Sequence, residues 1–110
     1  TLRDYARVGL FAKYDGVLPS GTRVLPEGWM AESTTPSQAY AGYGYQWWLY
    51  DDGAYAASGL FGQAIFIKPK ANLVIAVHSN GPPSSSASIY GRHLYNVLQA
   101  LGRHYTPRGE

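Results

Sequence analysis

Two glycines, Gly59 and Gly62, mark the part of this 110-residue sequence whose residue types could serve a reaction. The pattern predicts that both lie on one apolar strand, Ser58 to Ile67, before a tight connection and a second strand, Leu73 to Val77. Glycine weakens strand pairing, so it indicates a bulge or a close approach to the backbone. Spacing alone favours the bulge. The alternative is an oxyanion hole, in which the N–H of Leu60 points at a developing negative charge.

Other nucleophile and metal patterns are absent from the sequence. It contains neither G-x-S-x-G nor S-x-x-K, and its three histidines lack the spacing of a ligand pair. Ser84–Ser86 reads as turn and cap residues, whereas Ser58 has no base near it in sequence. We expect His93 to be a packed structural residue beside an apolar helix stripe. No metal site and no cofactor are predicted.

The composition is that of a globular domain or part of one. Hydrophobic residues make up 45% and charged residues 15%, with no cysteine. The net charge of +2 is too small and too scattered to indicate a nucleic-acid partner. No run of about 18 apolar residues could span a membrane.

The order of predicted elements indicates an α+β fold. A helix runs from its cap at Thr1 to Asp15–Gly16, a short helix covers Pro26 to Ser33, and a first strand covers Tyr43 to Tyr50. The two apolar strands follow, and a long helix occupies Ile89 to Leu101, with a fraying tail from Arg103. Three antiparallel strands that are apolar on both faces form an incomplete sheet, and we expect residues upstream of Thr1.

Alternation along the first strand predicts two aromatic faces. Tyr45 and Trp47 fall on one face, with Trp48 and Tyr50 on the other. Core packing explains one face, and the other could line an aromatic cleft. An exposed flat set of these rings would instead suit a carbohydrate-binding module.

Four phrases, in order, resemble the C-terminal part of penicillin-recognising serine hydrolases: TLRDYARVGLFAKYDG, VLPEGWMAES, YGYQWWL and ASGLFGQAIFIKPKANLVIAVHSN. These are relatives of class C β-lactamases and include esterases, D-amino-acid peptidases and nylon-oligomer hydrolases. The resemblance covers Thr1 to about Leu101. It implies that residues 1–110 are the C-terminal segment of a β-lactamase/transpeptidase-like domain, an antiparallel sheet with flanking N- and C-terminal helices. It also implies that the last helix packs on the sheet beside a helix supplied from the N-terminal end of the domain.

The resemblance further implies roles for individual residues. The catalytic S-x-x-K and Y-x-N motifs would lie before Thr1. The third motif, Lys-Thr-Gly or His-x-Gly, would match Ala57-Ser58-Gly59, so that Leu60 supplies the second oxyanion-hole N–H. Ala57 departs from the usual basic residue, which fits the amidase and esterase branch. The implied pocket residues are Trp47, with Trp48 as its alternative, and, as weaker candidates, Phe61 and Gln63.

The activity implied is cleavage of a small ester, amide or peptide through an acyl-serine intermediate. The expected partner is the upstream part of the same enzyme, and the isolated segment should be inactive. The resemblance favours the periplasm or cell envelope and leaves the cytoplasm open. Two alternatives remain, a non-catalytic aromatic-rich binding module and a scaffold relative.

Overall fold

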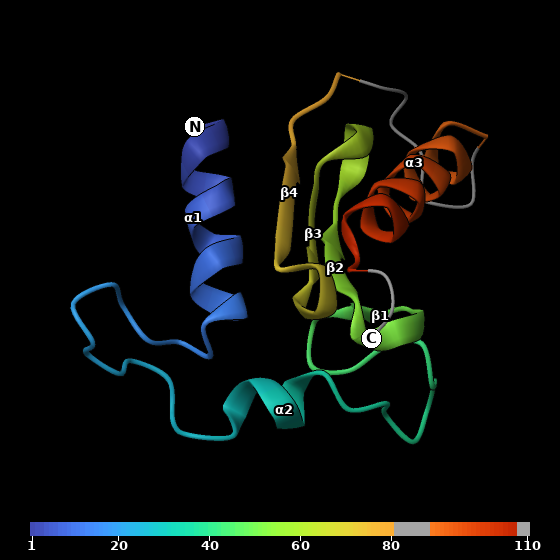
Figure 1. Ribbon diagram of the computed structural model, residues 1–110. Coiled ribbons are helices and arrows are strands. Elements are labelled where there is room, and N and C mark those ends of the chain that lie inside the picture. The colour runs from blue at the N-terminus through green and yellow to red at the C-terminus, as the bar shows by residue number, and fades with distance from the viewer. Residues whose placement is uncertain (81–88, 108–110) are drawn as a thin grey trace.

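The chain folds into one antiparallel sheet with a helix on each side, as a computed structural model of residues 1–80 and 89–107 describes it (Figure 1). Its four strands are β1 (Trp48–Leu49), β2 (Tyr55–Ser58), β3 (Ala64–Lys68) and β4 (Leu73–Val77). They pair in chain order, each antiparallel to the next. The α+β class and the flanking helices are therefore confirmed.

The expected single strand from Ser58 to Ile67 is wrong, because the chain reverses within it. The short 3₁₀ turn η2 (Leu60–Gly62) joins β2 to β3, and the N–H of Gly59 donates to the Gln63 carbonyl at 2.8 Å. Phe61 and Gly62 have φ of 63° and 84°, and these left-handed conformations turn the chain back on itself. The sheet consequently has four strands where three were expected.

The expected strand from Tyr43 to Tyr50 is also largely wrong. Only β1 pairs as a strand, and the residues before it form a tight hairpin. The N–H of Gly44 donates to the Trp47 carbonyl at 2.9 Å, and Gln46 reverses the chain with φ of 69°. A Cβ at Gly44 would collide with the Ser33 carbonyl oxygen, so packing against the end of a helix earlier in the chain requires glycine here.

The helices differ from expectation mainly at their ends. In α1 (Leu2–Lys13) the capping box of Thr1 and Asp4 is confirmed, and Asp15 and Gly16 end the helix with φ of 58° and 74°. The second helix, α2 (Trp29–Ser33), starts three residues later than Pro26. The last, α3 (Ile89–Tyr105), continues through residues expected to fray. Ser84–Ser86 lies outside the described residues.

The two faces of the sheet carry separate cores. Tyr55, Ile65 and Ile67 pack with Ala12 of α1, whereas Ala56, Ala64 and Phe66 pack with Leu98 of α3. Alternation along β3 places these sets on opposite faces. The two helices therefore lie on opposite sides of the sheet (Figure 1). No helix of the described part is long and apolar enough to cross a membrane.

The contact of α1 with the sheet depends on Gly9. A Cβ at this buried position would lie 2.5 Å from Val74 Cγ1 and 2.9 Å from Ile65 Cγ2. Both neighbours are β-branched side chains, which have little rotamer freedom to move away. Glycine in mid-helix thus serves close packing here.

We expect Gly9→Ala to destabilise the fold although alanine is the better helix former. At an open helix position the change would gain about 1 kcal/mol. Overpacking against β4 and β3 should outweigh this gain and leave a net loss of about 1–2 kcal/mol. Urea unfolding followed by circular dichroism measures the difference. Val8→Ala, at a neighbouring exposed position, is the control and should change stability by less than about 0.5 kcal/mol. Equal or higher stability of Gly9→Ala would contradict this packing.

Candidate functional site

The candidate site lies at the end of the sheet where β2 turns into β3, a segment we call the hairpin tip (Ser58–Gln63). The β2–β3 ladder ends at the pair Ser58 and Ala64, so Leu60 lies two residues beyond the last paired residue of β2. The Gly59 to Gln63 hydrogen bond closes the tip and fixes its backbone. No residue of the tip is charged, so the tip itself offers a ligand only peptide dipoles and neutral side chains.

Gly59 and Gly62 have different reasons to be glycine. Gly62 has a φ of 84°, which the turn requires and other residues rarely adopt. Gly59 lacks a left-handed φ, and a Cβ there would come no closer than 3.6 Å to Gln63 Cβ, an ordinary contact. Among the glycines tested within the described residues, only Gly59 combines an ordinary φ with room for a side chain. Packing among the described residues therefore does not account for a glycine at position 59.

Some side chains around the tip are exposed to solvent, and others are engaged in the sheet or in hydrogen bonds. Ser58 and Phe61 are exposed, whereas Ala57 lies in the ladder opposite Ile65. Gln63 is engaged with β4: its Nε2 donates to the Ser79 carbonyl, and its Oε1 accepts from the Ser79 N–H at 3.3 Å. Its amide thus anchors the tip to the end of β4, while Ser58 and Phe61 remain accessible to a ligand.

His78 lies at the same end of the sheet and was not singled out by the sequence. It follows Val77, whose partner in the ladder is Ala64, the first residue of β3. Its exposed ring contacts Tyr5 of α1 edge-on, with centroids 4.3 Å apart. The sequence signal that could have found it is its position directly after a strand that ends beside the tip.

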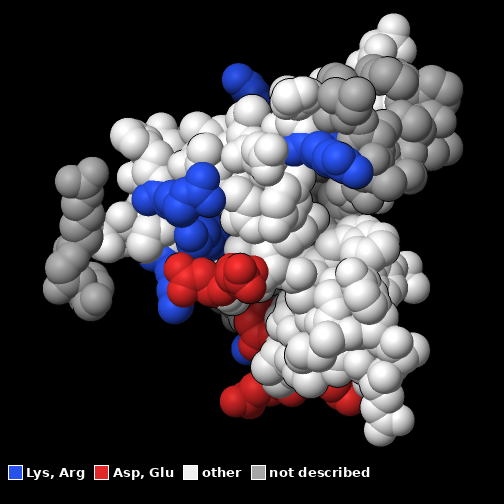
Figure 2. Space-filling model, turned by 90° about the vertical axis from the view of Figure 1, so that its right-hand side faces the viewer, with Lys and Arg blue, Asp and Glu red and all other residues white. Residues whose placement is uncertain are grey.

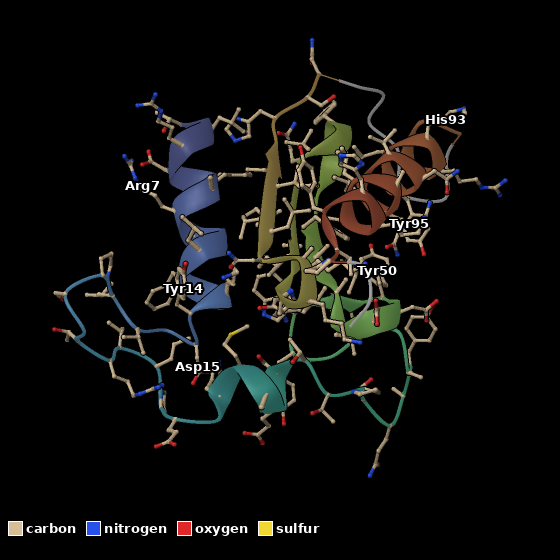
Figure 3. The ribbon with its side chains drawn as sticks, viewed as in Figure 1. Arg7, Tyr14, Asp15, Tyr50, His93 and Tyr95 are labelled. Atoms are coloured by element: carbon tan, nitrogen blue, oxygen red, sulfur yellow. The ribbon has the colours of Figure 1, made fainter. Side chains whose placement is uncertain are left out.

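The other histidines give no site. His93 is exposed on α3 (Figure 3), so the expectation of a packed structural residue is wrong. No group of three or more metal-ligating side chains occurs among the residues that the structure places.

Both tryptophans predicted for the pocket contact other aromatic rings. Trp47 packs edge-on against Tyr55 with ring centroids 5.1 Å apart, and Trp48 packs against Tyr43 at 4.6 Å. Trp48 pairs with Ala56 in the β1–β2 ladder, two residues before Ser58, where the tip begins. The structure therefore places Ala57, Ser58, Phe61 and Gln63 close to Leu60 along the chain, and β1 beside the strand that leads to the tip.

Burial shifts the titration of two tyrosines in this part of the sheet. Desolvation, with a smaller contribution from the charge of Asp15, raises the pKa of Tyr55 to about 12. Desolvation also raises the pKa of Tyr50, and the nearby Tyr95, whose ring centroid is 5.1 Å away, adds to the effect (Figure 3). Both shifts follow from packing, since a phenolate loses its hydration inside a core.

Comparison with known proteins finds a matching family model and a related hydrolase. The family model described as beta-lactamase matches residues 1–99. The chain is also 29% identical, over 119 aligned residues, to 6-aminohexanoate-dimer hydrolase of Paenarthrobacter ureafaciens. That alignment covers 92% of this chain and 30% of the relative, so the chain spans less than a third of the relative's length.

The buried Tyr55 predicts a loss of stability at high pH. Its pKa of about 12 in the folded state exceeds its ordinary value of 10.0. The unfolded chain therefore releases this proton first, and the stabilisation, complete below pH 10, is lost as the pH rises towards 12. Between about pH 9 and about pH 11.5 the free energy of unfolding should fall by about 1–2 kcal/mol more in the natural chain than in Tyr55→Phe. Denaturant unfolding of both proteins measures this, and equal pH dependence would show that Tyr55 does not titrate with a raised pKa.

Proposed function

Since this chain belongs to the beta-lactamase family, we propose that it is one segment of a serine hydrolase cleaving an ester or amide through an acyl-serine intermediate. The segment supplies the N–H of Leu60 as one donor of the oxyanion hole, and part of a pocket wall. The observation that carries this role is Gly59, a glycine next to Leu60 that packing against the residues the structure describes does not require. The relative, named as a hydrolase of 6-aminohexanoate dimer, supports the same class of reaction.

In this reaction the segment has to supply one rigidly held N–H donor for the oxyanion. Attack of a serine on a carbonyl places negative charge on the carbonyl oxygen, and a fixed N–H stabilises that charge in the transition state. Removing one such donor typically raises the barrier by about 3 kcal/mol. The hydrogen bond from Gly59 to Gln63 and those between Gln63 and Ser79 hold the tip in place. This preorganisation is what an oxyanion hole needs.

The pocket wall is assigned to the accessible residues of the tip. Ser58 offers a hydroxyl and Phe61 an exposed ring, and Ala57 contributes no charge. A neutral substrate group suits this wall better than a carboxylate, because no cation is present at the tip. Trp47, with Trp48 as its alternative, is assigned to the same wall, since Trp48 pairs with Ala56 in the β1–β2 ladder, two residues before Ser58.

The remaining catalytic groups come from another part of the enzyme in this proposal. The nucleophilic serine and its lysine belong to S-x-x-K and the tyrosine to Y-x-N, and the present sequence contains neither motif. The partner of this segment is therefore the upstream part of the same enzyme, and the substrate is a small ester, amide or peptide.

A carbohydrate-binding function is less well supported. The exposed rings include Trp29, Tyr40, Tyr45 and Trp48. They meet in tilted or edge-on pairs: the planes of Trp29 and Tyr45 are 44° apart, and those of Tyr40 and Trp48 are 75° apart. Such pairs do not provide the flat platform on which a sugar ring stacks.

The first prediction from this proposal is that activity requires both this segment and the upstream part of the enzyme. The segment alone should not hydrolyse p-nitrophenyl esters, whereas a mixture with a fragment carrying S-x-x-K and Y-x-N should. Release of p-nitrophenol measures both reactions. Turnover by the isolated segment would contradict the proposal, because a nucleophile would then reside within these residues.

The second prediction separates activity from stability at Gly59. In the reconstituted mixture Gly59→Ala should lower kcat/KM at least tenfold, since a methyl group would obstruct the carbonyl that approaches Leu60. Stability should remain equal or rise by about 0.4–1 kcal/mol, because the φ is ordinary and alanine restricts the unfolded chain. Ser20→Ala, on an exposed loop, is the control and should leave both unchanged. Full activity of Gly59→Ala would remove the tip from the active site.

A further inference from the structure

A second set of polar groups surrounds an open depression at the other end of the sheet from the hairpin tip. The depression has a volume of about 500 Å³ and lies between the turn η1 (Asp51–Gly53), the end of β3 and one face of α3. That size accommodates a small molecule. The turn precedes β2 and Lys68 ends β3, so the strands themselves separate this depression from the tip.

Lys68 is a buried cation in the wall of this depression, and it is paired with the carboxylate of Asp52. Its side chain is 5% exposed, and its Nζ forms an ion pair with Asp52 Oδ2 at 3.7 Å. Asp52 is also bound by the ammonium of Lys70, which forms the shorter contact. An ammonium has three donors, and burial of a charge is costly unless it is well paired. The contact with Asp52 engages one donor of Lys68, so a ligand carboxylate in the depression could accept from another.

A close fit against α3 holds the Lys68 stem in place. A Cβ at Gly102 would lie 3.0 Å from Lys68 Cδ and 3.6 Å from its Nζ. Glycine at this position of the helix leaves the space through which the lysine reaches the depression. The cation is thus positioned by packing of its alkyl chain, as expected for a side chain that buries its stem.

Two further charges on the rim have no partner among the described residues. Asp51 and Arg103 are exposed, and neither side chain forms an ion pair or hydrogen bond with a residue that the structure describes. Figure 2 shows acidic and basic side chains side by side on the face where α3 lies. The four ionised residues that line the depression, Asp51, Asp52, Lys68 and Arg103, sum to zero formal charge.

We propose that this depression binds a small zwitterion that carries one ammonium and one carboxylate group, such as a free amino acid. The carboxylate accepts from Lys68 and from the planar fork of Arg103, which matches carboxylate geometry. The ammonium donates to Asp51. A simple anion would meet the carboxylate of Asp51, and a simple cation would meet Lys68 and Arg103. A zwitterion satisfies both ends and leaves the sum of charges unchanged.

The helix side of the depression suits the middle of such a ligand. The side chains of Asn96 and Gln99 line this side together with the ring of Tyr95. Gln99 Nε2 donates to the Tyr95 hydroxyl at 3.2 Å, so the phenol is held towards the helix. Amide and ring together can contact a short polar or aliphatic chain.

Titration of the chain with defined probes tests the proposal. The probes are glycine and straight-chain amino acids of increasing length between ammonium and carboxylate, with acetate and methylammonium as single-charge controls. Isothermal calorimetry, with two-dimensional NMR to locate shifted amides, measures binding. At least one zwitterion should bind saturably and at least tenfold more tightly than either single-charge probe, with shifts at η1 and the C-terminal half of α3. Equal affinity of acetate, or no saturable binding by any zwitterion, would overturn the proposal.

Variants at the exposed rim identify the two ends of the ligand. Arg103→Gln and Asp51→Asn should each weaken binding of the zwitterion at least fivefold. For Arg103→Gln, any gain in the affinity of methylammonium should stay below tenfold. Arg92→Gln, an exposed arginine nearer the start of the same helix, is the matched control and should bind normally. Unchanged affinity in both rim variants would contradict the site. The outcome is independent of ester hydrolysis, because neither variant touches the hairpin tip.

Discussion

Burial of β3 on both faces is the constraint on which the rest of this structure depends. All five residues of the strand are buried, and Ile67 and Phe66 are 0% and 1% exposed although they point to opposite sides. Each face therefore needs its own cover, which α1 and α3 provide. Full burial of each such side chain contributes about 1.5–3 kcal/mol. A slip of one residue would exchange the two faces, so this strand also fixes the register of its neighbours.

Because β3 is buried along its whole length, polar groups that could bind a ligand lie only at its two ends. At one end the chain turns through the hairpin tip and exposes peptide groups and neutral side chains. At the other end Lys68 is still within the strand, and its ammonium emerges beside α3 next to acidic residues. Both candidate sites thus follow from one packing arrangement. The tip has no charged residue and the depression has several, so the two ends suit different ligands.

The sequence predicted those elements whose signals are local. The capping box of Thr1 and Asp4 and the left-handed residues after Lys13 define α1 without help from the rest of the fold. The connection after Lys68 is another case, because Pro69 starts a turn and Asn72 ends it with φ of 53°. Local chemistry was sufficient at these positions.

Elements that depend on distant contacts or unusual conformations were not predictable in this way. The hairpin tip was hidden because Leu60 and Phe61 are apolar and read as strand, although Phe61 adopts a left-handed conformation that is rare for a large side chain. The side of the sheet that α3 covers was equally hidden, since an apolar stripe identifies a buried face and not its partner. Among the site residues, Gly59 and Leu60 were visible in sequence. The grouping of Lys68 with Arg103 was not, because only the fold brings these segments together.

The different reasons for glycine in this chain make the strongest argument about function. Gly9 and Gly44 admit close neighbours, and Gly62 and Gly16 adopt left-handed conformations, so the fold explains each of them. Gly59 has neither reason, since it has an ordinary φ and room for a Cβ. What a glycine provides at such a place is access to the adjacent backbone from outside the segment. In a chain of the beta-lactamase family that spans 30% of a hydrolase relative, a reacting carbonyl bound to another part of the enzyme would need that access, and Leu60 is the residue whose N–H it would reach.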